Sequence, residues 1–582
     1  MKRIFVLILI LTLYTQLYAQ YRNPNGMPGP NYWQNKPQYS IEANLLTQES
    51  KIIAHEHIVY SNNSPCKLDS LVFNLYCNAI EDNSYSISGV CVNDSETKFI
   101  IDKTKMFVPL ANPIMPSNSV DIDVYWTLKI NKGKSTRTSH YETGYFVGYW
   151  YPQIAVFDDD GWDMVYHSGM EEFYFEDADY DITITADNGY NVWASVAKTD
   201  SQELANGVTK YHFVANNFYD FAFAAIKDIE TTEIPVKSGS KEVNFIVLSN
   251  DKKICNHVKM SAEIVAGKMA SEMAPAIEFP FSQLVVFDNG GYNGGMEFPG
   301  MINIGIQDNS NATSRFVIRH ELAHEYAPFL AGFNQAKEGF MDEGFAMFLP
   351  FVAYNYDNMK EIPKCINKCF IMDESTGDIA ENNSYPKLPL TFESFKFAQY
   401  SEYNSITYNK SFETLYMLRE VLGNDKMTKL IHDFFLAWAG KHPKAEDFIN
   451  AAKFAYGSDL DWFIKPWFYS PEHPDLAITQ CRIIGNKIKV TIKNVTGVPI
   501  SVKLLACNQI DADDCGYYTS NPQHKYFSPE IWKDGKQTID IEFDKLQYPF
   551  IIELGHNNIT DATYKNNFKE IKSVKDFGIY KD

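Results

Sequence analysis

Residues 40–226 alternate between apolar and polar positions in short runs that are separated by turn residues. The runs SLVFNLYC, SVDIDVYWTLKI and DYDITITA show the pattern clearly. Alternation with a period of two places every second side chain on the same face of a β-strand. The pattern therefore predicts an antiparallel β-domain over residues 40–226.

The pattern changes in residues 227–475, where apolar residues recur at every third or fourth position. This spacing predicts helices, with a few strands such as QLVVFD and MINIGI between them. The predicted helices cover residues 255–273, 313–327, 344–354, 408–421 and 424–439. Residues 476–582 return to alternation, as in KIKVTIKN and QTIDIEF, which predicts a β-sandwich-like domain. We therefore expect a multidomain α+β protein.

The first 39 residues carry a different kind of signal. Lys2 and Arg3 precede an apolar run, and Ala19 offers a small residue for cleavage. These features are typical of a secretory signal peptide. We expect residues 1–19 to be removed on export to the periplasm or the outside of the cell. Residues 20–39 are rich in Pro, Gly and Asn and are expected to form an extended leader.

Composition narrows the range of functions. With 582 residues, of which 45% are hydrophobic, the chain is long enough for about two to four packed domains. Its net charge of −21 argues against a nucleic-acid partner, which needs a basic surface. No segment after the predicted signal peptide is apolar over the length that a transmembrane helix requires.

The cysteines give little further information. There are nine, so at least one is unpaired within the chain, and Cys507 with Cys515 is a plausible local disulfide. Cys365 and Cys369 lack the second pair of ligands that a zinc–cysteine site would need.

The segment VIRHELAHEYA, residues 317–327, contains the main candidate chemistry. His320 and His324 are four residues apart, which places both imidazoles on one face of a helix. Two imidazoles on a rigid backbone suit Zn²⁺, and Glu321 is placed to act as general base on an attacking water molecule. The alternative is that this short motif occurs here by chance.

A catalytic zinc site needs a third protein ligand and one position left open. Glu343, in GFMDEGFAMF, follows His324 after 18 intervening residues. That distance allows a loop and a second helix packed against the first. Asp342 is the rival, but the longer side chain of Glu343 makes it the preferred ligand.

Taken together, these residues resemble the zinc aminopeptidases of peptidase family M1, the group of aminopeptidase N. The resemblance rests on His-Glu-x-x-His followed by eighteen residues and Glu, on GGMEF at residues 294–298, and on YNKSFETLYMLREVLG from Tyr408. The last two are similar to the family's Gly-x-Met-Glu-Asn strand and Tyr-x-Lys-Gly helix. Similarity covers most of residues 40–475. It implies a thermolysin-like catalytic domain over residues 227–475 that binds one Zn²⁺ per chain.

The resemblance also implies how a peptide substrate binds. It places the recognition of the free α-ammonium group on Glu297. The strand that leads to this glutamate, Gly294, Gly295 and Met296, would pair with the substrate backbone by strand addition.

A further implied role is that of Tyr408, which would donate a hydrogen bond to the oxyanion formed when water attacks the carbonyl. Tyr403 lies nearby in the sequence. The Lys410 that follows Tyr408, and the apolar helical run after it, select Tyr408.

Several positions depart from the family's usual pattern. Phe298 stands where Asn is common, and Glu325-Tyr326 stands where Gln-Trp is common. A Gln or Glu from the N-terminal domain usually helps to hold the amine, and Glu142 is the candidate for it here. We expect an exported zinc aminopeptidase that acts on peptides with a free N-terminus. The alternatives are a thermolysin-like zinc endopeptidase and a non-catalytic peptide-binding relative.

Overall fold

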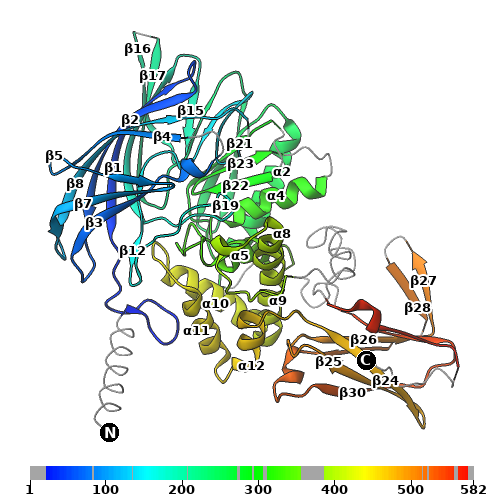
Figure 1. Ribbon diagram of the computed structural model, residues 1–582. Coiled ribbons are helices and arrows are strands. Elements are labelled where there is room, and N and C mark those ends of the chain that lie inside the picture. The colour runs from blue at the N-terminus through cyan, green and yellow to red at the C-terminus, as the bar shows by residue number, and fades with distance from the viewer. Residues whose placement is uncertain are drawn as a thin grey trace, which may run out of the picture.

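The computed structural model describes residues 21–80, 84–133, 135–205, 207–271, 275–290, 294–305, 311–355, 386–513, 516–520, 523–555 and 561–573. The predicted signal peptide and Cys365, Cys369 and Cys515 lie outside these residues. The chain forms an N-terminal β-rich domain, a central helical region with its own sheet, and a C-terminal β-domain (Figure 1). This order confirms the multidomain α+β fold class predicted from the sequence.

The N-terminal domain is built on an eight-stranded sheet with the order β16-β17-β14-β1-β2-β8-β4-β5. Its strands are β1 (Lys36–Leu46), β2 (Lys51–Ser61), β4 (Ser84–Val92), β5 (Ser95–Glu96), β8 (Ser119–Lys129), β14 (Ala178–Asp187), β16 (Lys198–Leu204) and β17 (Val208–Phe218). Neighbouring strands are antiparallel except β1 and β14, which are parallel. A parallel pair needs a long crossover, and here most of the domain lies between the two strands.

Smaller sheets complete the domain. Two have four strands each, in the orders β15-β18-β10-β9 and β11-β3-β7-β6, and β12 pairs with β13. The strands are β3 (Leu68–Asn74), β6 (Ile100–Asp102), β7 (Lys105–Ile114), β9 (Thr138–Tyr141), β10 (Gly144–Val147), β11 (Gln153–Ile154), β12 (Phe157–Asp158), β13 (Gly161–Trp162), β15 (Asn191–Ala194) and β18 (Phe223–Ile226), with a short helix η1 (Tyr76–Ala79). The inward-facing residues of β1, such as Ile41, and the fully buried Trp126 and Trp150 lie in one core.

One polar side chain interrupts this core. Glu56 on β2 is fully buried, and neither of its carboxylate oxygens has a hydrogen-bond partner among the described residues. Burial raises the pKa of Glu56 well above its ordinary value because the charged form would lose its hydration. The neutral carboxyl is therefore favoured, at a cost in stability that grows with pH.

Replacing Glu56 with methionine is expected to raise the free energy of unfolding by about 1–3 kcal/mol at pH 7, because an unpaired buried carboxyl is removed at similar volume. The folded-state pKa lies above the unfolded-state value, so the ionisation penalty is absent below about pH 4 and grows as pH rises. Urea unfolding at pH 4 and pH 7 measures both effects. Glu42→Met, on the exposed face of β1, is the matched control, and an equal effect in the two variants would contradict the expectation.

The central region begins with a five-stranded sheet of order β19-β20-β21-β23-β22. Its strands are β19 (Thr231–Ser238), β20 (Lys241–Leu248), β21 (Gln283–Asp288), β22 (Gly294–Phe298) and β23 (Met301–Gly305). β22 is an edge strand that pairs antiparallel with β23. Helix α4 packs against both of these strands, which places the histidine motif beside the sheet edge.

Helices form the rest of the central region (Figure 1). They are α2 (Lys252–Ala262), η2 (Glu263–Lys268), α3 (Met269–Ser271), α4 (Asn311–Ala323), α5 (Gly339–Asn355), η4 (Ser394–Lys396), α8 (Tyr400–Tyr403), η5 (Asn404–Lys410), α9 (Ser411–Leu422), α10 (Asn424–Ala437), α11 (Ala445–Tyr456), α12 (Asp461–Ile464) and η6 (Lys465–Tyr469). The predicted helices lie where the pattern placed them, but α4 ends at Ala323 rather than at residue 327. His324 lies in the following turn, where its amide still donates to the His320 carbonyl at 3.3 Å.

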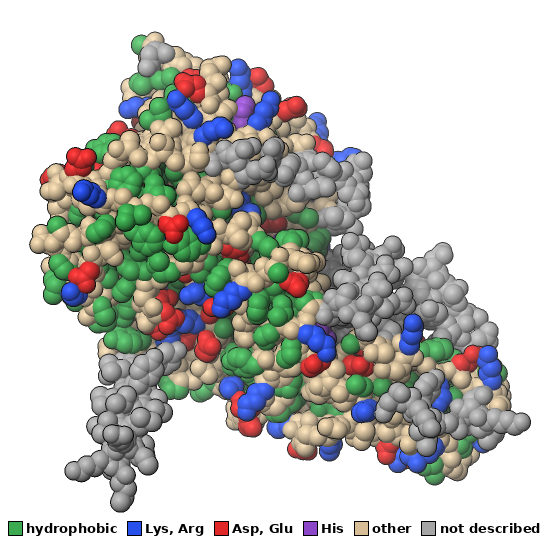
Figure 2. All heavy atoms as spheres, in the orientation of Figure 1, with side chains coloured by type: hydrophobic (Ala, Val, Ile, Leu, Met, Phe, Trp, Pro, Cys, Tyr) green, Lys and Arg blue, Asp and Glu red, His purple; other side chains and the backbone are tan. Residues whose placement is uncertain are grey.

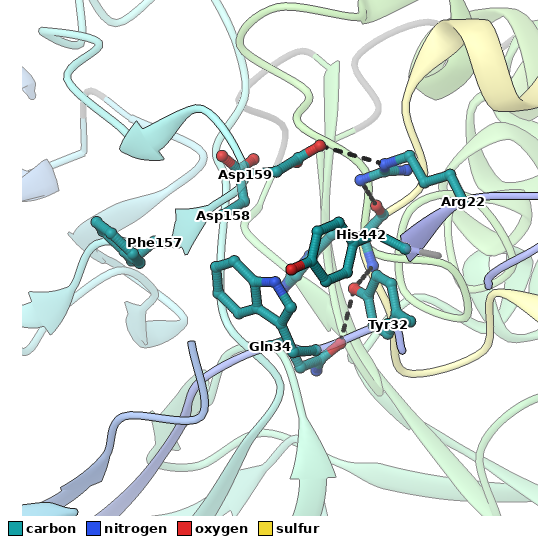
Figure 3. A pocket seen from close by; sticks show the side chains of 9 residues that line it. Arg22, Tyr32, Gln34, Phe157, Asp158, Asp159 and His442 are labelled. Carbon is teal, nitrogen blue, oxygen red and sulfur yellow. Dashed lines mark hydrogen bonds and ion pairs between the residues drawn. The ribbon is translucent and has the colours of Figure 1, made fainter. Parts of the chain in front are cut away.

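Residues 21–35, which we call the tether, join the N-terminal domain to the helical region (Figure 3). Arg22 is 3% exposed and donates to the His442 carbonyl at 3.0 Å and to the Asp447 carboxylate. Its guanidinium also lies 5.1 Å from the centre of the Trp438 ring. The predicted leader is thus a packed segment of the structure, and β1 begins inside it.

The C-terminal domain projects from the body as a separate lobe (Figure 2). It contains two sheets, β24-β25-β30 and β29-β26-β31-β32, and the hairpin β27-β28. The elements are β24 (Leu476–Ile484), β25 (Lys487–Asn494), β26 (Val502–Cys507), β27 (Gln509–Asp513), β28 (Gly516–Ser520), β29 (Gln523–Phe527), η7 (Pro529–Trp532), β30 (Thr538–Asp544), β31 (Phe550–Leu554), η8 (Tyr564–Asn566) and β32 (Phe568–Ile571). Trp467 anchors the lobe by donating to the Pro499 carbonyl at 2.9 Å. Within the described ranges, none of the helices has the length and apolar character needed to cross a membrane.

Candidate active site

The three side chains that the sequence predicts as metal ligands meet between α4 and α5. Glu343 Oε2 lies 3.0 Å from His320 Nε2 and 3.5 Å from His324 Nε2, and the two nitrogens are 3.2 Å apart. All three residues are buried. Ligand bonds of about 2.0–2.1 Å in a tetrahedral zinc site require ligand atoms about 3.3–3.4 Å apart. The observed separations therefore fit a single ion.

The hydrogen bonding of these atoms also suits a cation. His324 Nδ1 lies 2.9 Å from the Ala327 carbonyl, which can accept only from a protonated nitrogen, so the Nε2 lone pair can face the ligand cluster. Glu343 Oε2 is buried and lacks a partner in hydrogen-bond geometry among the described residues. These unsatisfied acceptors point toward one another, which only a positive charge between them would stabilise.

The surrounding charge is strongly negative. Burial opposes a charge on His324, but the carboxylates of Glu297 and Asp342 raise its pKa well above the ordinary value. Burial likewise opposes a charge on Glu343, but the facing imidazoles hold the pKa of its carboxyl well below the ordinary range. Asp342, the rival ligand of the sequence analysis, lies with Oδ1 3.0 Å from His324 Nδ1, on the side of the ring away from the cluster. A bound divalent cation would offset this excess of negative charge.

Close helix packing fixes Glu343. The neighbouring Gly344 on α5 faces Ser411 at the start of α9, and a Cβ atom at Gly344 would lie 2.5 Å from the Ser411 Cβ. Only glycine allows this approach of the two helices. The same helix contacts α4, so that Glu343 and His320 are held on packed helices, and His324 lies in the turn that directly follows α4.

Glu321 lies against the edge strand. It is 5% exposed, and a Cβ atom at Gly295 would lie only 2.0 Å from its Oε1. Glycine at this position therefore makes room for the carboxylate. Burial and the charge of Glu297 raise the pKa of Glu321 well above its ordinary value, a shift that suits a group that gains and loses a proton.

Glu297 projects from β22 toward the ligand cluster. It is 4% exposed, and one of its oxygens lies within 4.8 Å of ligand atoms of both His324 and Asp342. Its Oε1 is buried without a hydrogen-bond partner among the described residues. Earlier in the strand, Met296 is buried and Gly294, at φ +112°, has open space where a side chain would be. Strand β22 thus carries a carboxylate without a hydrogen-bond partner at Glu297 and leaves open space beside its backbone at Gly294.

Phe298, which replaces the family's usual Asn, has a packing role. It is fully buried, and its ring centre lies 5.1 Å from that of Phe146 and 4.7 Å from that of Tyr149 in the N-terminal domain. A Cβ atom at Gly148 would lie 2.1 Å from the Phe298 ring. The aromatic ring therefore fastens β22 to the N-terminal domain.

Tyr408 lies in the π-helical segment η5, an irregularity that is common at functional sites. Its hydroxyl donates to Glu343 Oε1 at 2.5 Å, and its ring stacks on His320 with centres 5.5 Å apart. Tyr403 also reaches Glu343, at 3.4 Å, but is 1% exposed. Tyr408 is the less buried of the two, which favours it as the residue that faces a substrate.

The structure brings two residues to the site that the sequence analysis missed. Arg137 donates to Glu172 Oε1 at 2.5 Å, and both come from the N-terminal domain. Glu172 Oε2 is buried without a hydrogen-bond partner among the described residues. Burial raises the pKa of Glu172 well above its ordinary value, and the charge of Glu297 raises it further while Arg137 lowers it. Glu142, the earlier candidate, is exposed.

The two remaining departures from the family pattern face away from the cluster. Glu325 is fully buried and accepts a hydrogen bond from the Gly300 amide at 2.9 Å. Tyr326 is also fully buried and donates to the Val265 carbonyl at 3.3 Å. Both side chains therefore support the packing of α4 rather than line the site.

Comparisons with known proteins agree with this arrangement. The family model described as "Peptidase family M1 domain" matches residues 272–467. The "Probable aminopeptidase 1" of Sulfurisphaera tokodaii is 24% identical over 165 residues, which cover 28% of this chain and 20% of that protein. Across the matching curated relatives, the aligned region spans 20–32% of their length.

Solved structures share the fold. The crystal structure of Legionella pneumophila aminopeptidase A in complex with aspartic acid superposes with a TM-score of 0.64 at 14% identity, over 90% of this chain and 59% of that one. The M1 zinc metallopeptidase from Deinococcus radiodurans superposes with a TM-score of 0.55 at 13% identity, over 76% and 95% of the two chains.

The fold of solved metallopeptidase structures and a buried His-His-Glu cluster thus occur together in this chain. The matched domain includes α4, the turn that follows it and α5, which carry this cluster, and also η5, which carries Tyr408. Residues 272–467 match the domain of peptidase family M1, which confirms the family resemblance for this part of the chain.

Proposed function

We propose that this protein is a zinc-dependent aminopeptidase that removes N-terminal residues from peptides. The observation that carries the proposal is the placement of an unsatisfied, buried Glu297 carboxylate within 4.8 Å of a His324 ligand atom. A free α-ammonium group held by Glu297 would place the first peptide bond of the substrate next to the His-His-Glu cluster, which we call the metal cluster below. We also propose export, which the apolar run after Lys2 and Arg3 supports.

In this proposal His320, His324 and Glu343 hold one zinc ion. When bound, zinc supplies Lewis-acid polarisation of the scissile carbonyl and activates water at neutral pH. Glu321 takes the proton from the attacking water and passes it to the leaving amine. Tyr408, beside the ligand cluster, donates its hydroxyl to the developing oxyanion.

Recognition of the amine involves a second carboxylate. Glu172 and Glu297 each leave one buried oxygen without a hydrogen-bond partner among the described residues, and Arg137 compensates only one of the two charges. A substrate ammonium would balance the remaining negative charge. Because Glu172 belongs to the N-terminal domain and Glu297 to the central region, binding of the amine would require both parts of the protein.

The test compares an aminoacyl anilide with its N-acetylated form. Cleavage of the first but not of the second is expected, because acetylation removes the positive charge that Glu297 and Glu172 bind. Glu172→Gln is expected to raise KM for the free-amine substrate by about tenfold, because the variant loses one charge-assisted hydrogen bond to the substrate ammonium. Equal cleavage of both substrates would favour an endopeptidase, and cleavage of neither would favour a non-catalytic binding protein.

Gly295 offers a test of how Glu321 is positioned. Gly295→Ala is expected to lower kcat by about 10²-fold with little change in Tm, since the new methyl group displaces the carboxylate by about 1 Å or more. Gly267→Ala, where the nearest atom would lie at 3.6 Å, is the control and should keep kcat. A normal kcat in Gly295→Ala would show that the Glu321 carboxylate does not act from the position described.

A further inference from the structure

A groove separate from the candidate active site lies where the tether, the N-terminal domain and the central region meet. Its volume is about 700 Å³, within the range of about 300–1,000 Å³ that is typical of ligand sites. The residues that line the groove include Trp33, Asp177, Tyr219, Phe281, Phe329 and Gly440. None of the residues assigned above to the metal cluster or to amine binding lines it.

Asp177 gives the groove a negative charge. Its side chain lines the groove although the residue is only 7% exposed, and Oδ1 has no hydrogen-bond partner among the described residues. Burial raises the pKa of Asp177 to about 6, so the carboxylate is ionised at pH 7.5. Gly440, at φ +67°, lies so close that a Cβ atom there would be 2.9 Å from Asp177 Oδ2. The backbone at Gly440 therefore packs closely against the carboxylate.

The cations around Asp177 are already paired with other groups. Lys36 Nζ lies 2.9 Å from Asp179 Oδ1 and donates to Asn217 at 2.6 Å. Lys441 Nζ donates to two carbonyls at the end of α10, at 3.2 and 3.4 Å. The His442 ring lies 2.9 Å from Glu176. Among the described residues, Asp177 therefore makes no direct ion pair, although Lys36 and His442 lie close enough to lower the pKa of its carboxyl.

Aromatic side chains form much of the remaining wall. Trp33 of the tether and Phe281 are partly exposed, whereas Tyr219 and Phe329 are 5% exposed. Tyr219 is fixed by donating to the Lys441 carbonyl at 3.3 Å and accepting from the Gly332 amide at 3.0 Å. Figure 3 shows the same stretch of tether from close by, where the Tyr32 hydroxyl donates to Gln34 Oε1 at 2.9 Å. This hydrogen bond helps to fix the tether residues on either side of Trp33.

A carboxylate and aromatic rings that line the same groove suit an organic cation, because the faces of the rings and the carboxylate both attract positive charge. We propose that this groove binds a lysine or arginine side chain of a peptide. Aliphatic stems of these side chains would pack on the rings while the charged end reaches Asp177. The proposal does not depend on the proposed peptidase activity, because the groove and the metal cluster share no residue.

The test uses peptides that cannot bind by a free N-terminus. Acetyl-Ala-Lys-Ala-amide and its norleucine analogue, which has the same stem without the charge, are titrated into the full-length protein. Calorimetry measures binding, and quenching of tryptophan fluorescence that is lost in Trp33→Phe reports binding beside Trp33. We expect the lysine peptide to bind about tenfold or more tightly than the norleucine peptide at pH 7.5, from one charged contact and one or more cation–π contacts.

Variants assign the binding to the groove. Asp177→Asn should remove the preference for lysine, whereas Asp181→Asn should keep it, because Asp181 is an exposed carboxylate of β14 that pairs with His212. Glu297→Gln should also keep it, which separates this site from amine binding. Circular dichroism and Tm establish that each variant is folded. The proposal is overturned if wild-type protein does not bind the lysine peptide, if the norleucine peptide binds equally well, or if a folded Asp177→Asn variant keeps the preference.

Discussion

Replacing Glu321 with glutamine is expected to lower kcat by about 10²–10⁴-fold, the range for loss of a general base, while one zinc ion per chain stays bound. Glutamine fits the space beside Gly295 but cannot accept the proton from water. Because the metal ligands are unchanged, KM should change little. Steady-state kinetics together with zinc analysis of the same sample measure both quantities.

Glu325→Gln is the matched control for this experiment. Glu325 is equally buried and only four residues away, but its carboxylate accepts from the Gly300 amide instead of facing the metal cluster. Glutamine preserves that acceptor, so activity should remain within a few-fold of the wild type. A Glu321→Gln variant as active as this control would show that another group deprotonates the water.

Replacing Glu343 with alanine is expected to abolish zinc retention on dialysis and to lower kcat/KM by at least about 10³-fold, since Lewis-acid stabilisation is worth several kcal/mol. Two imidazoles alone leave the site below the three protein ligands that catalytic zinc usually has. Added zinc should raise the Tm of the metal-free wild type and leave that of Glu343→Ala unchanged, because the ion stabilises only a protein that binds it.

Asp342→Asn distinguishes the ligand from its neighbour. Asp342 lies against the Nδ1 side of His324, so its loss should weaken zinc binding by only about 10–100-fold, as is usual for residues that support a ligand. Competition with a zinc chelator of known affinity gives the value for each variant. If Asp342→Asn lost zinc as completely as Glu343→Ala, the two residues would have exchanged the roles assigned here.

The proximity of His320, His324 and Glu343 was largely predictable because the sequence patterns that indicate it are local. His320 and His324 are four apart on an amphipathic stretch, and the apolar pattern around Glu343 predicts the second helix. Spacing fixes which residues lie on one face of a helix, so the three side chains could be proposed without coordinates. The exact end of α4 could not be predicted, since its last turn is decided by tertiary contacts such as that of His324 with the Ala327 carbonyl.

Other residues of the candidate site are not identified by any short pattern in the sequence. Arg137 and Glu172 lie in irregular segments between strands, and only the packing of the N-terminal domain on β22 brings them to Glu297. The π-helical turn that carries Tyr408 is likewise invisible to a search for a period of 3.6 residues. In the sequence, Phe298 differs from the residue usual in the motif. Its packing role is visible only in the structure, where its ring contacts Gly148 and the neighbouring aromatic rings.

The tether has a consequence for the order in which the protein can mature. The Arg22–Asp447 contact joins residues 425 positions apart in the chain. During synthesis the first of these residues emerges long before the second, so the N-terminal sheet can form early while its clasp to the helices must wait until α11 has been made. The contacts of the tether with the helical region would then be among the last parts of the structure to form.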